Sequence, residues 1–367
     1  MNQKPGLLYY FLKIYLRPVF RLYYRRIRIK GKEHIPVSGP VIFAVNHQNA
    51  FMDALVVATA SVRNPWFLTR ASVFASSVVR FWLNKLQLIP IYRFRDGMAA
   101  MKRNEETLET CRQLLQNNQC ILIFPEGSHE GQWSLRPLQK GLARIVFSAM
   151  EKLDGELDIQ IVPVGLQYEN IFAGWSDLLI SFGKPIHSST YYQLYKTDSG
   201  RAELDLMEEV RQGISALMVD IQPAGEYQTR HEALLARPGR EADLVKRLEG
   251  DKQFLREFNS AKSASKPKQS SLNKLWCLPS AILLLPHLPA LWLIRMVVNA
   301  IVKDHHWTSS IRLAAFAFGA PFVYAAELYM LSGYFKLWQL VIIALLILPA
   351  TGLVGLRLRD RCHGSAL

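Results

Sequence analysis

Residues 40–53 read PVIFAVNHQNAFMD, an apolar run that ends in a polar turn and continues with helix-forming residues. The run Pro40–Val45 has the length and composition of a buried β-strand. In α/β proteins, the turn after the carboxyl end of such a strand often carries functional side chains. His47 and Asp53 follow this strand, and a carboxylate can orient a histidine so that it acts as a general base. A histidine near an aspartate is also common as a structural pair.

The alternation of apolar runs with helical stretches continues through the middle of the chain. Further strands are predicted at Trp66–Thr69, Leu88–Tyr92, Cys120–Phe124, Ile159–Gln167 and Leu178–Phe182. Helices are predicted between them at Ser72–Lys85, Met98–Gln116 and Leu142–Leu153. This order predicts an α/β domain with a central, mostly parallel sheet covered by helices. We expect the domain over residues 33–260, with a motif core at 35–185 and a charged helical part at 200–258.

Three further candidate residues lie in or just after predicted strands. Arg93 closes IPIYR, Glu126 lies in FPEGS, and Pro163 lies in IVPVG. In LQKG, Lys140 and a glycine open a predicted helix, an arrangement that suits a phosphate. Each residue also has a plain structural interpretation: Arg93 as a surface charge, Glu126 as its ion-pair partner, and Pro163 as a break in a strand.

Taken in chain order, the blocks NHQNAFMD, IPIYR, FPEGS and VPVG resemble the PlsC-like superfamily of glycerolipid acyltransferases. Its signature is an NHxSxxD block, a G-x-I-x-R strand, FPEGTRS and a V-P-V/I strand. The resemblance covers roughly residues 35–185, and the shared order of the blocks makes a chance match very improbable.

The resemblance implies transfer of an acyl group from a thioester carrier, acyl-CoA or acyl-carrier protein, to a hydroxyl of a glycerol phosphate. By matching position, His47 is implied as the base and Asp53 as its partner. The residues implied to bind the substrates are Arg93, Glu126, Gly127, Ser128, Lys140 and, on the acyl-donor side, Pro163. The resemblance implies no cofactor beyond this co-substrate and no metal.

Two departures from the signature bear on the acceptor. Five residues separate His47 from Asp53 (HX5D) where the family usually has four, and FPEGSHE places His129 where the family usually has arginine. Both variants resemble the branch of fungal glycerol-3-phosphate and dihydroxyacetone-phosphate acyltransferases. Glycerol-3-phosphate and 1-acylglycerol-3-phosphate remain equal candidates, and the sequence determines neither the acyl chain length nor the oligomeric state.

The chain is 50% hydrophobic and carries a formal net charge of +14, which excludes intrinsic disorder and indicates an anionic partner surface. Residues 1–32 contain nine Lys or Arg and no acid. Lys13, Arg17, Arg21 and Arg25 recur every fourth residue beside aromatic side chains. This pattern predicts a basic amphipathic helix at an anionic membrane surface. A basic helix packed on its own domain is the alternative.

The C-terminal quarter of the chain is apolar and follows a Ser/Lys-rich linker at 261–274. Leu313–Phe335 and Leu337–Leu356 are long enough to cross a bilayer, with a turn at Lys336 between them. Three arginines between 357 and 361 predict a cytoplasmic C-terminus by the positive-inside rule. A cytoplasmic catalytic domain then requires an even number of crossings. Trp276–Val302, which prolines interrupt, is therefore interpreted as a re-entrant or interfacial element, or a short helix pair.

These observations predict a membrane-bound acyltransferase of phospholipid biosynthesis whose catalytic domain faces the cytoplasm. Two other classes stay open: a non-catalytic lipid-binding protein on the same fold, and an acyltransferase for another lipid acceptor. We expect no nucleic-acid partner, because the positive charge lies beside apolar residues rather than along a polar surface. The four cysteines form no CxxC pair, so we expect no structural zinc.

Overall fold

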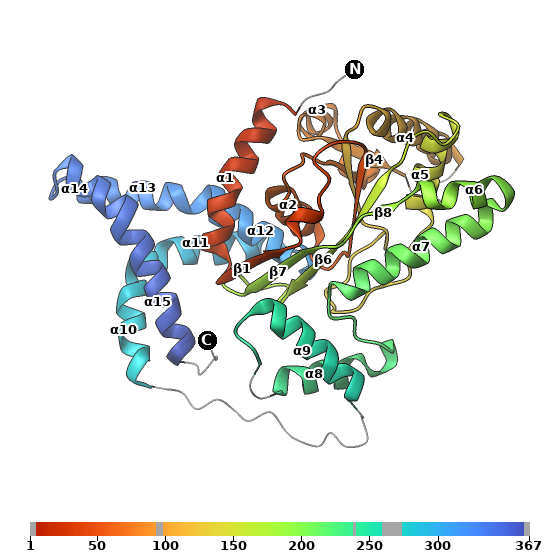
Figure 1. Cartoon of the computed structure of the whole chain (residues 1–367). Helices are drawn as coiled ribbons and strands as arrows, with labels where there is room; N and C mark the ends of the chain where they lie inside the picture. Colours follow the sequence, from red (N-terminus) through yellow and green to blue (C-terminus); the bar gives the residue numbers. More distant parts are fainter. Residues whose placement is uncertain (1–4, 93–97, 238–239, 259–273, 363–367) are drawn as a thin grey trace. The chain divides into compact units, whose positions relative to one another are not determined.

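The computed structural model describes residues 5–92, 98–237, 240–258 and 274–362 (Figure 1). They fall into two compact units. The first contains the chain up to Pro18, Ile27–Glu169 and Leu178–Ala224, and the second contains Val19–Arg26, Asn170–Asp177 and the chain from Gly225. Residues 225–258, which we expected within the catalytic domain, therefore group with the C-terminal helices.

A single eight-stranded sheet organises the first unit, in the order β1-β7-β6-β2-β5-β3-β4, with β8 paired to β6. Strand β2 pairs in parallel with β5 and β6, and β3 pairs in parallel with β4 and β5. Strands β7 and β8 run antiparallel to β6. The predicted α/β class with a mostly parallel sheet is thus confirmed. The strands are β1 (Arg26–Lys30), β2 (Val41–Val45), β3 (Trp66–Arg70), β4 (Leu88–Ile91), β5 (Cys120–Ile123), β6 (Gln160–Tyr168), β7 (Asp177–Phe182) and β8 (Ile186–His187).

Helices cover both faces of this sheet. The helices are α1 (Leu7–Tyr23), α2 (Ala50–Ala60), α3 (Ser77–Lys85), α4 (Met98–Gln116), α5 (Gly141–Glu151), α6 (Ser189–Thr197) and α7 (Ser199–Ala216). In Figure 1, α2 lies on one face and α5 and α7 lie on the other. The core on the α5 side joins strand residues such as Ile42 and Ile121 to Phe147 of α5 and Val210 of α7. Helix α5 fits there because its apolar residues recur at helical spacing and form one buried face.

The N-terminal segment is a helix over only part of its predicted length. Helix α1 ends at Tyr23, and Arg26–Lys30 forms strand β1 instead. The sequence RIRIK alternates charged and apolar residues with a period of two, which suits a strand. The helix predicted at Ser72–Lys85 is also shorter, because α3 begins only after Ser76, whose side chain accepts a hydrogen bond from the Val79 amide.

The basic stripe of α1 does not form one solvent-facing surface, which corrects the predicted headgroup face. Lys13 is buried, and its Nζ donates to the Arg63 carbonyl at 2.6 Å and to Asn64 Oδ1 at 2.8 Å. Arg17 and Arg21 remain exposed. The surface that α1 exposes before them consists of apolar and aromatic residues at helical spacing, Leu7, Tyr10, Phe11 and Ile14.

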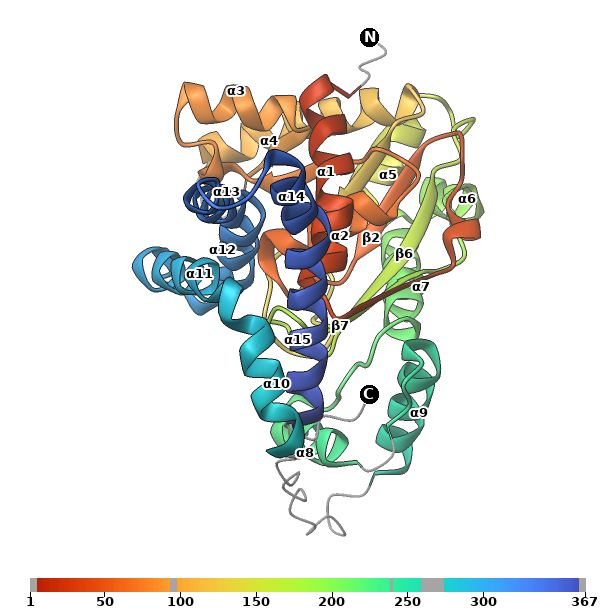
Figure 2. The same cartoon turned by 90° about the vertical axis from the view of Figure 1, so that its left-hand side faces the viewer.

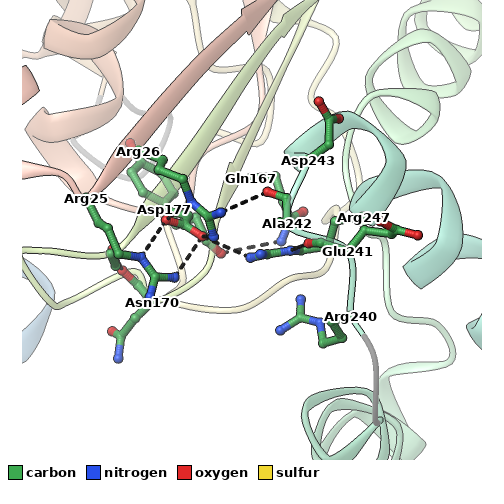
Figure 3. Close-up of polar contacts among 12 residues, drawn as sticks. Arg25, Arg26, Gln167, Asn170, Asp177, Arg240, Glu241, Ala242, Asp243 and Arg247 are labelled. Atoms are coloured by element: carbon green, nitrogen blue, oxygen red, sulfur yellow. Dashed lines mark hydrogen bonds and ion pairs between the residues drawn. The ribbon is translucent and has the colours of Figure 1, made fainter. Parts of the chain in front are cut away.

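The second unit contains a cluster of arginines around one buried aspartate (Figure 3). Asp177 Oδ2 lies 2.8 Å from Arg25, 2.6 Å from Arg26 and 3.0 Å from Arg247. Arg247 belongs to α9 (Leu244–Glu257), which follows α8 (Tyr227–Ala236). A buried carboxylate needs such partners, because desolvation of an unpaired charge is costly. Arg25 and Arg26 thus have a structural role here.

The C-terminal helices of the second unit include three that are long and apolar enough to cross a membrane: Leu275–Ile301, Thr308–Leu331 and Leu337–Asp360. The second and third match the predicted hairpin and its turn. Leu275–Ile301, which we interpreted as re-entrant, interfacial or a short helix pair, also has the length and composition of a full span, so its path depends on the contacts of its two ends. The component helices are α10 (Lys274–Leu284), α11 (Leu288–Ile301), α12 (Thr308–Ala314), α13 (Ala320–Leu331), α14 (Leu337–Ile342) and α15 (Leu348–Cys362).

Helices α10 and α15 lie side by side in both views (Figures 1 and 2). Gly355 of α15 approaches Leu284, and Gly352 approaches His287, so the start of α10 lies near the end of α15. His287 also lies 2.8 Å from the hydroxyl of Tyr324 in α13 and 3.2 Å from that of Thr351 in α15. These polar contacts join three helices within an apolar bundle.

Candidate active site

The site is built around His47, which follows β2, and Asp53, in the first turn of α2. His47 Nδ1 lies 2.9 Å from Asp53 Oδ2, so the pair is in contact despite the extra residue between them. Asp53 is fully buried and the side chain of His47 is 14% exposed. When Nδ1 donates to the carboxylate, Nε2 is the nitrogen that can accept a proton from a substrate.

The turn between them closes around the carboxylate. The amides of Gln48 and Asn49 both donate to Asp53 Oδ2 at 2.8 Å. Ala50 has φ 40°, a left-handed value that is uncommon for alanine, and α2 begins there. The turn thus reverses the chain between His47 and the start of the helix that carries Asp53.

Two residues that we did not predict make further hydrogen bonds at the site, one to the Asp53 carboxylate and one at the end of β2. Tyr168, the last residue of β6, donates its hydroxyl to Asp53 Oδ1 at 2.8 Å. Asn46 makes a pair of hydrogen bonds with the backbone of Leu166, donating at 3.0 Å and accepting at 2.7 Å. Because β6 runs parallel to β2, its carboxyl end reaches the same edge of the sheet. A tyrosine three residues after the VPVG block was the available signal for this contact.

Glu126 lies at the end of the neighbouring strand β5, where it holds two backbone segments. Its Oε1 accepts from the His47 amide at 2.6 Å, and its Oε2 accepts from the Arg136 amide at 3.1 Å. The side chain is buried. These contacts make Glu126 a residue that positions the histidine loop, a role the sequence did not indicate.

The pKa of Glu126 is raised to about 7, mainly because the carboxyl group is buried; the hydrogen bonds from the His47 and Arg136 amides lower it, and the nearby carboxylate of Asp53 adds a smaller upward contribution. Gly127 follows with φ 71°, the left-handed region that favours glycine, and its amide donates to the Phe124 carbonyl at 3.0 Å. The FPEGS segment is therefore a tight turn beside His47.

Two aromatic rings define the position of the His47 imidazole. The Phe124 ring stacks on it with centroids 3.9 Å apart and an interplanar angle of 12°. His129 meets it edge to face, with centroids 5.1 Å apart. His129, which occupies the position where the resembled family has arginine, thus packs against the proposed base. The fixed ring geometry favours proton transfer from one direction.

The remaining predicted residues differ in how they relate to this pair. Arg93 lies outside the described residues. Ser128 accepts a hydrogen bond from Arg136 at 2.5 Å. Lys140 precedes α5, with Nζ 3.4 Å from Glu203 of α7. Pro163 is buried inside β6, where its ring lies close to Gly213 of α7, so its described contacts belong to the fold.

The arrangement fits base-assisted attack by a substrate hydroxyl. It offers an oriented imidazole at the carboxyl edge of β2, with a buried carboxylate behind it and a glycine turn in front. Among the described residues, no group of three or more His, Cys, Asp or Glu side chains is placed to hold a metal ion.

Comparison with known proteins gives matches to part of the chain. Residues 26–167 match the family model described as Acyltransferase. Glycerol-3-phosphate O-acyltransferase 1 of Saccharomyces cerevisiae is 28% identical over 118 residues, which are 31% of this chain and 15% of the yeast protein. The human 1-acyl-sn-glycerol-3-phosphate acyltransferase alpha is 24% identical over 154 residues, covering 42% of this chain and 50% of that protein.

A solved structure also resembles the chain. The crystal structure of the 1-acyl-sn-glycerophosphate acyltransferase PlsC from Thermotoga maritima aligns with a TM-score of 0.39 and 14% identity, over 56% of this chain and 79% of that one. The matches to the yeast and human relatives span at most half the length of those proteins.

Proposed function

We propose that this chain moves an acyl group from a thioester carrier to a hydroxyl of glycerol-3-phosphate or 1-acylglycerol-3-phosphate, because its residues 26–167 match the Acyltransferase family model. The observation that supports this most is the 2.9 Å contact between His47 Nδ1 and Asp53 Oδ2 beside the FPEGS turn. Relatives named for each of the two acceptors match part of the chain.

In the proposed reaction, His47 Nε2 takes the proton of the acceptor hydroxyl as the oxygen attacks the thioester carbonyl carbon. A C–O bond forms and the C–S bond breaks, and the proton is passed to the leaving thiolate. Asp53 stabilises the imidazolium that exists between these transfers. The carrier is acyl-CoA or acyl-carrier protein. Binding of the acceptor through its phosphate places the acceptor hydroxyl near His47.

The test is an assay of the purified full-length protein in detergent. It compares glycerol-3-phosphate, dihydroxyacetone phosphate and 1-acylglycerol-3-phosphate, each with both acyl carriers. Wild type should consume thioester with at least one acceptor, and His47→Ala should lose that turnover while its melting temperature stays close to wild type. Near-normal turnover by His47→Ala would overturn the mechanism. Absence of thioester consumption with every acceptor would favour the non-catalytic lipid-binding alternative.

We also propose that the protein is attached to a membrane, with the exposed apolar faces of α1 and α3 against the lipid. The support is the three helices of spanning length and two exposed apolar helix faces. Helix α3 exposes Val78, Phe81 and Trp82, and the end of α3 at Lys85 lies beside Gly6, just before α1. Basic residues on α1 and α3 suit anionic headgroups.

An even number of crossings agrees best with the contacts of the second unit. Ser309, near the start of α12, donates to the Ile171 carbonyl at 2.8 Å, and Asp360, near the end of α15, accepts from Trp175 at 3.0 Å. Both outer ends of the hairpin therefore contact the segment that joins β6 to β7. Since α10 starts beside the end of α15, we propose that Leu275–Ile301 enters the membrane and returns.

Labelling in sealed proteoliposomes tests this topology. An impermeant maleimide should label Ser199→Cys, in α7, and Ser365→Cys from the same side. Gly333→Cys, in the turn between α13 and α14, should react from the opposite side. Labelling of Ser199→Cys and Ser365→Cys from opposite sides would show an odd number of crossings.

A further inference from the structure

Arg136 lies between the FPEGS turn and α5, in a segment that hydrogen bonds fix beside that turn. Its amide donates to Glu126 Oε2 at 3.1 Å. The amide of Leu135 donates to Asp220 Oδ1 at 2.9 Å, and the amide of Gln139 donates to the Pro125 carbonyl at 2.7 Å. The backbone is therefore held by hydrogen bonds on both sides of Arg136. This fixes the position from which the Arg136 side chain extends.

The guanidinium itself lies on the turn. Nη1 donates to Ser128 Oγ at 2.5 Å and lies 3.4 Å from Glu130 Oε1. The Arg136 side chain is 34% exposed and Glu130 is 51% exposed, so an approaching anion can reach the cation. An ion pair this exposed contributes little free energy, and a ligand with higher charge can replace the carboxylate at low cost.

One carboxylate links the backbone of Arg136 to the backbone of His47. Glu126 holds the His47 amide with Oε1 and the Arg136 amide with Oε2. His129, the residue after Ser128, also packs edge to face on the His47 ring. Glu126 therefore joins the backbone of Arg136 to that of His47, and the guanidinium contacts Ser128, which directly precedes the His129 that packs on the imidazole.

We propose that Arg136 and Ser128 form the subsite for the phosphate monoester of the acceptor, an inference that rests on the proposed function. A guanidinium and a hydroxyl offer several donors to a phosphate dianion, and guanidinium matches its oxygens in pairs. The sequence FPEGSHE carries histidine where the resembled family has arginine. Arg136 supplies the missing guanidinium from ten residues beyond Glu126 instead.

Direct binding and turnover together test this subsite on the full-length protein in detergent. Arg136→Gln should raise the dissociation constant of glycerol-3-phosphate, measured by calorimetry, by roughly tenfold to a hundredfold. KM for the phosphorylated acceptor should rise by a similar factor, while kcat changes much less. Glu130→Gln removes the competing carboxylate and should lower both constants. Arg136→Lys should restore part of the affinity.

Arg201→Gln is the matched control, because Arg201 is a 65% exposed arginine paired with Asp205 on α7. A dissociation constant for Arg136→Gln within twofold of the control would overturn the subsite. The calorimetric measurement does not need turnover, so it tests the subsite even if no acyl transfer is found. Absence of acyl transfer by the wild-type protein would contradict the proposed function. Unchanged binding of glycerol-3-phosphate by an Arg136→Gln variant that is still active would contradict only this inference.

Discussion

His47 Nδ1 lies 2.9 Å from Asp53 Oδ2, across five intervening residues that fold into a turn around the carboxylate. Two backbone amides and the Tyr168 hydroxyl donate to the same carboxylate. Asp53 is therefore the fixed point of the site, and the imidazole takes its orientation from it. The consequences can be measured one group at a time.

Asp53→Asn should lower acyl transfer by about 10²–10⁴-fold, because an amide facing Nδ1 favours the wrong imidazole tautomer. The measurement is the turnover of purified protein with the preferred acceptor. Asp154→Asn is the control: Asp154 is exposed, and its φ of 47° is one that asparagine accepts readily. Turnover of Asp53→Asn within threefold of this control would remove Asp53 from the mechanism.

Glu126 should make stability depend on pH in a predictable direction. Its pKa is about 7 in the fold, against 4.5 in the unfolded chain, so between these values only the folded state keeps the proton. Wild-type stability should therefore fall as pH rises from 4.5 to 7, by on the order of 3 kcal/mol. Glu126→Gln lacks this titration.

The measurement is the melting temperature of both proteins in detergent across that pH range. The difference between Glu126→Gln and wild type should move in favour of the variant as pH rises. Glutamine cannot accept from both amides with carboxylate oxygens, so turnover of the variant should fall at every pH. A difference in melting temperature that does not change with pH would contradict the buried, protonated state of Glu126.

The two sides of α1 should respond differently to substitution. Lys13→Met removes a buried donor to Arg63 and Asn64 and should destabilise the protein by about 1–3 kcal/mol, seen as a lower melting temperature. Phe11→Asp changes an exposed side chain, so it should leave the melting temperature unchanged and lower turnover in anionic proteoliposomes but not in detergent. The reverse pattern would mean that Lys13 faces the lipid.

Asp177→Ala should destabilise the second unit by about 3–5 kcal/mol, because it leaves Arg25, Arg26 and Arg247 without the carboxylate they share. Thermal unfolding in detergent measures the effect. Asp205→Ala removes an exposed partner of Arg201 and should cost less than about 1 kcal/mol. Equal shifts for the two variants would show that the arginine cluster carries no special stability.

Much of the fold could be predicted from local patterns. The strands at Val41–Val45 and Cys120–Ile123 follow from short apolar runs, and Met98–Gln116 follows from helical periodicity. Where prediction failed, a long-range partner was decisive. RIRIK after Tyr23 could extend a helix or form a strand, and only the free edge beside β7 makes it β1.

Local sequence patterns are enough to predict the α/β class, the apolar C-terminal helices and the positions of His47, Asp53 and Glu126 after strands, because these features depend on nearby residues and on the spacing of apolar side chains. The contacts of those residues depend on how distant segments pack. Tyr168 reaches Asp53, and Glu126 holds His47 beside Arg136, because β6 and β5 flank β2 in the sheet. That strand order, like the inward direction of Lys13, is set by packing between distant segments, which no local pattern encodes.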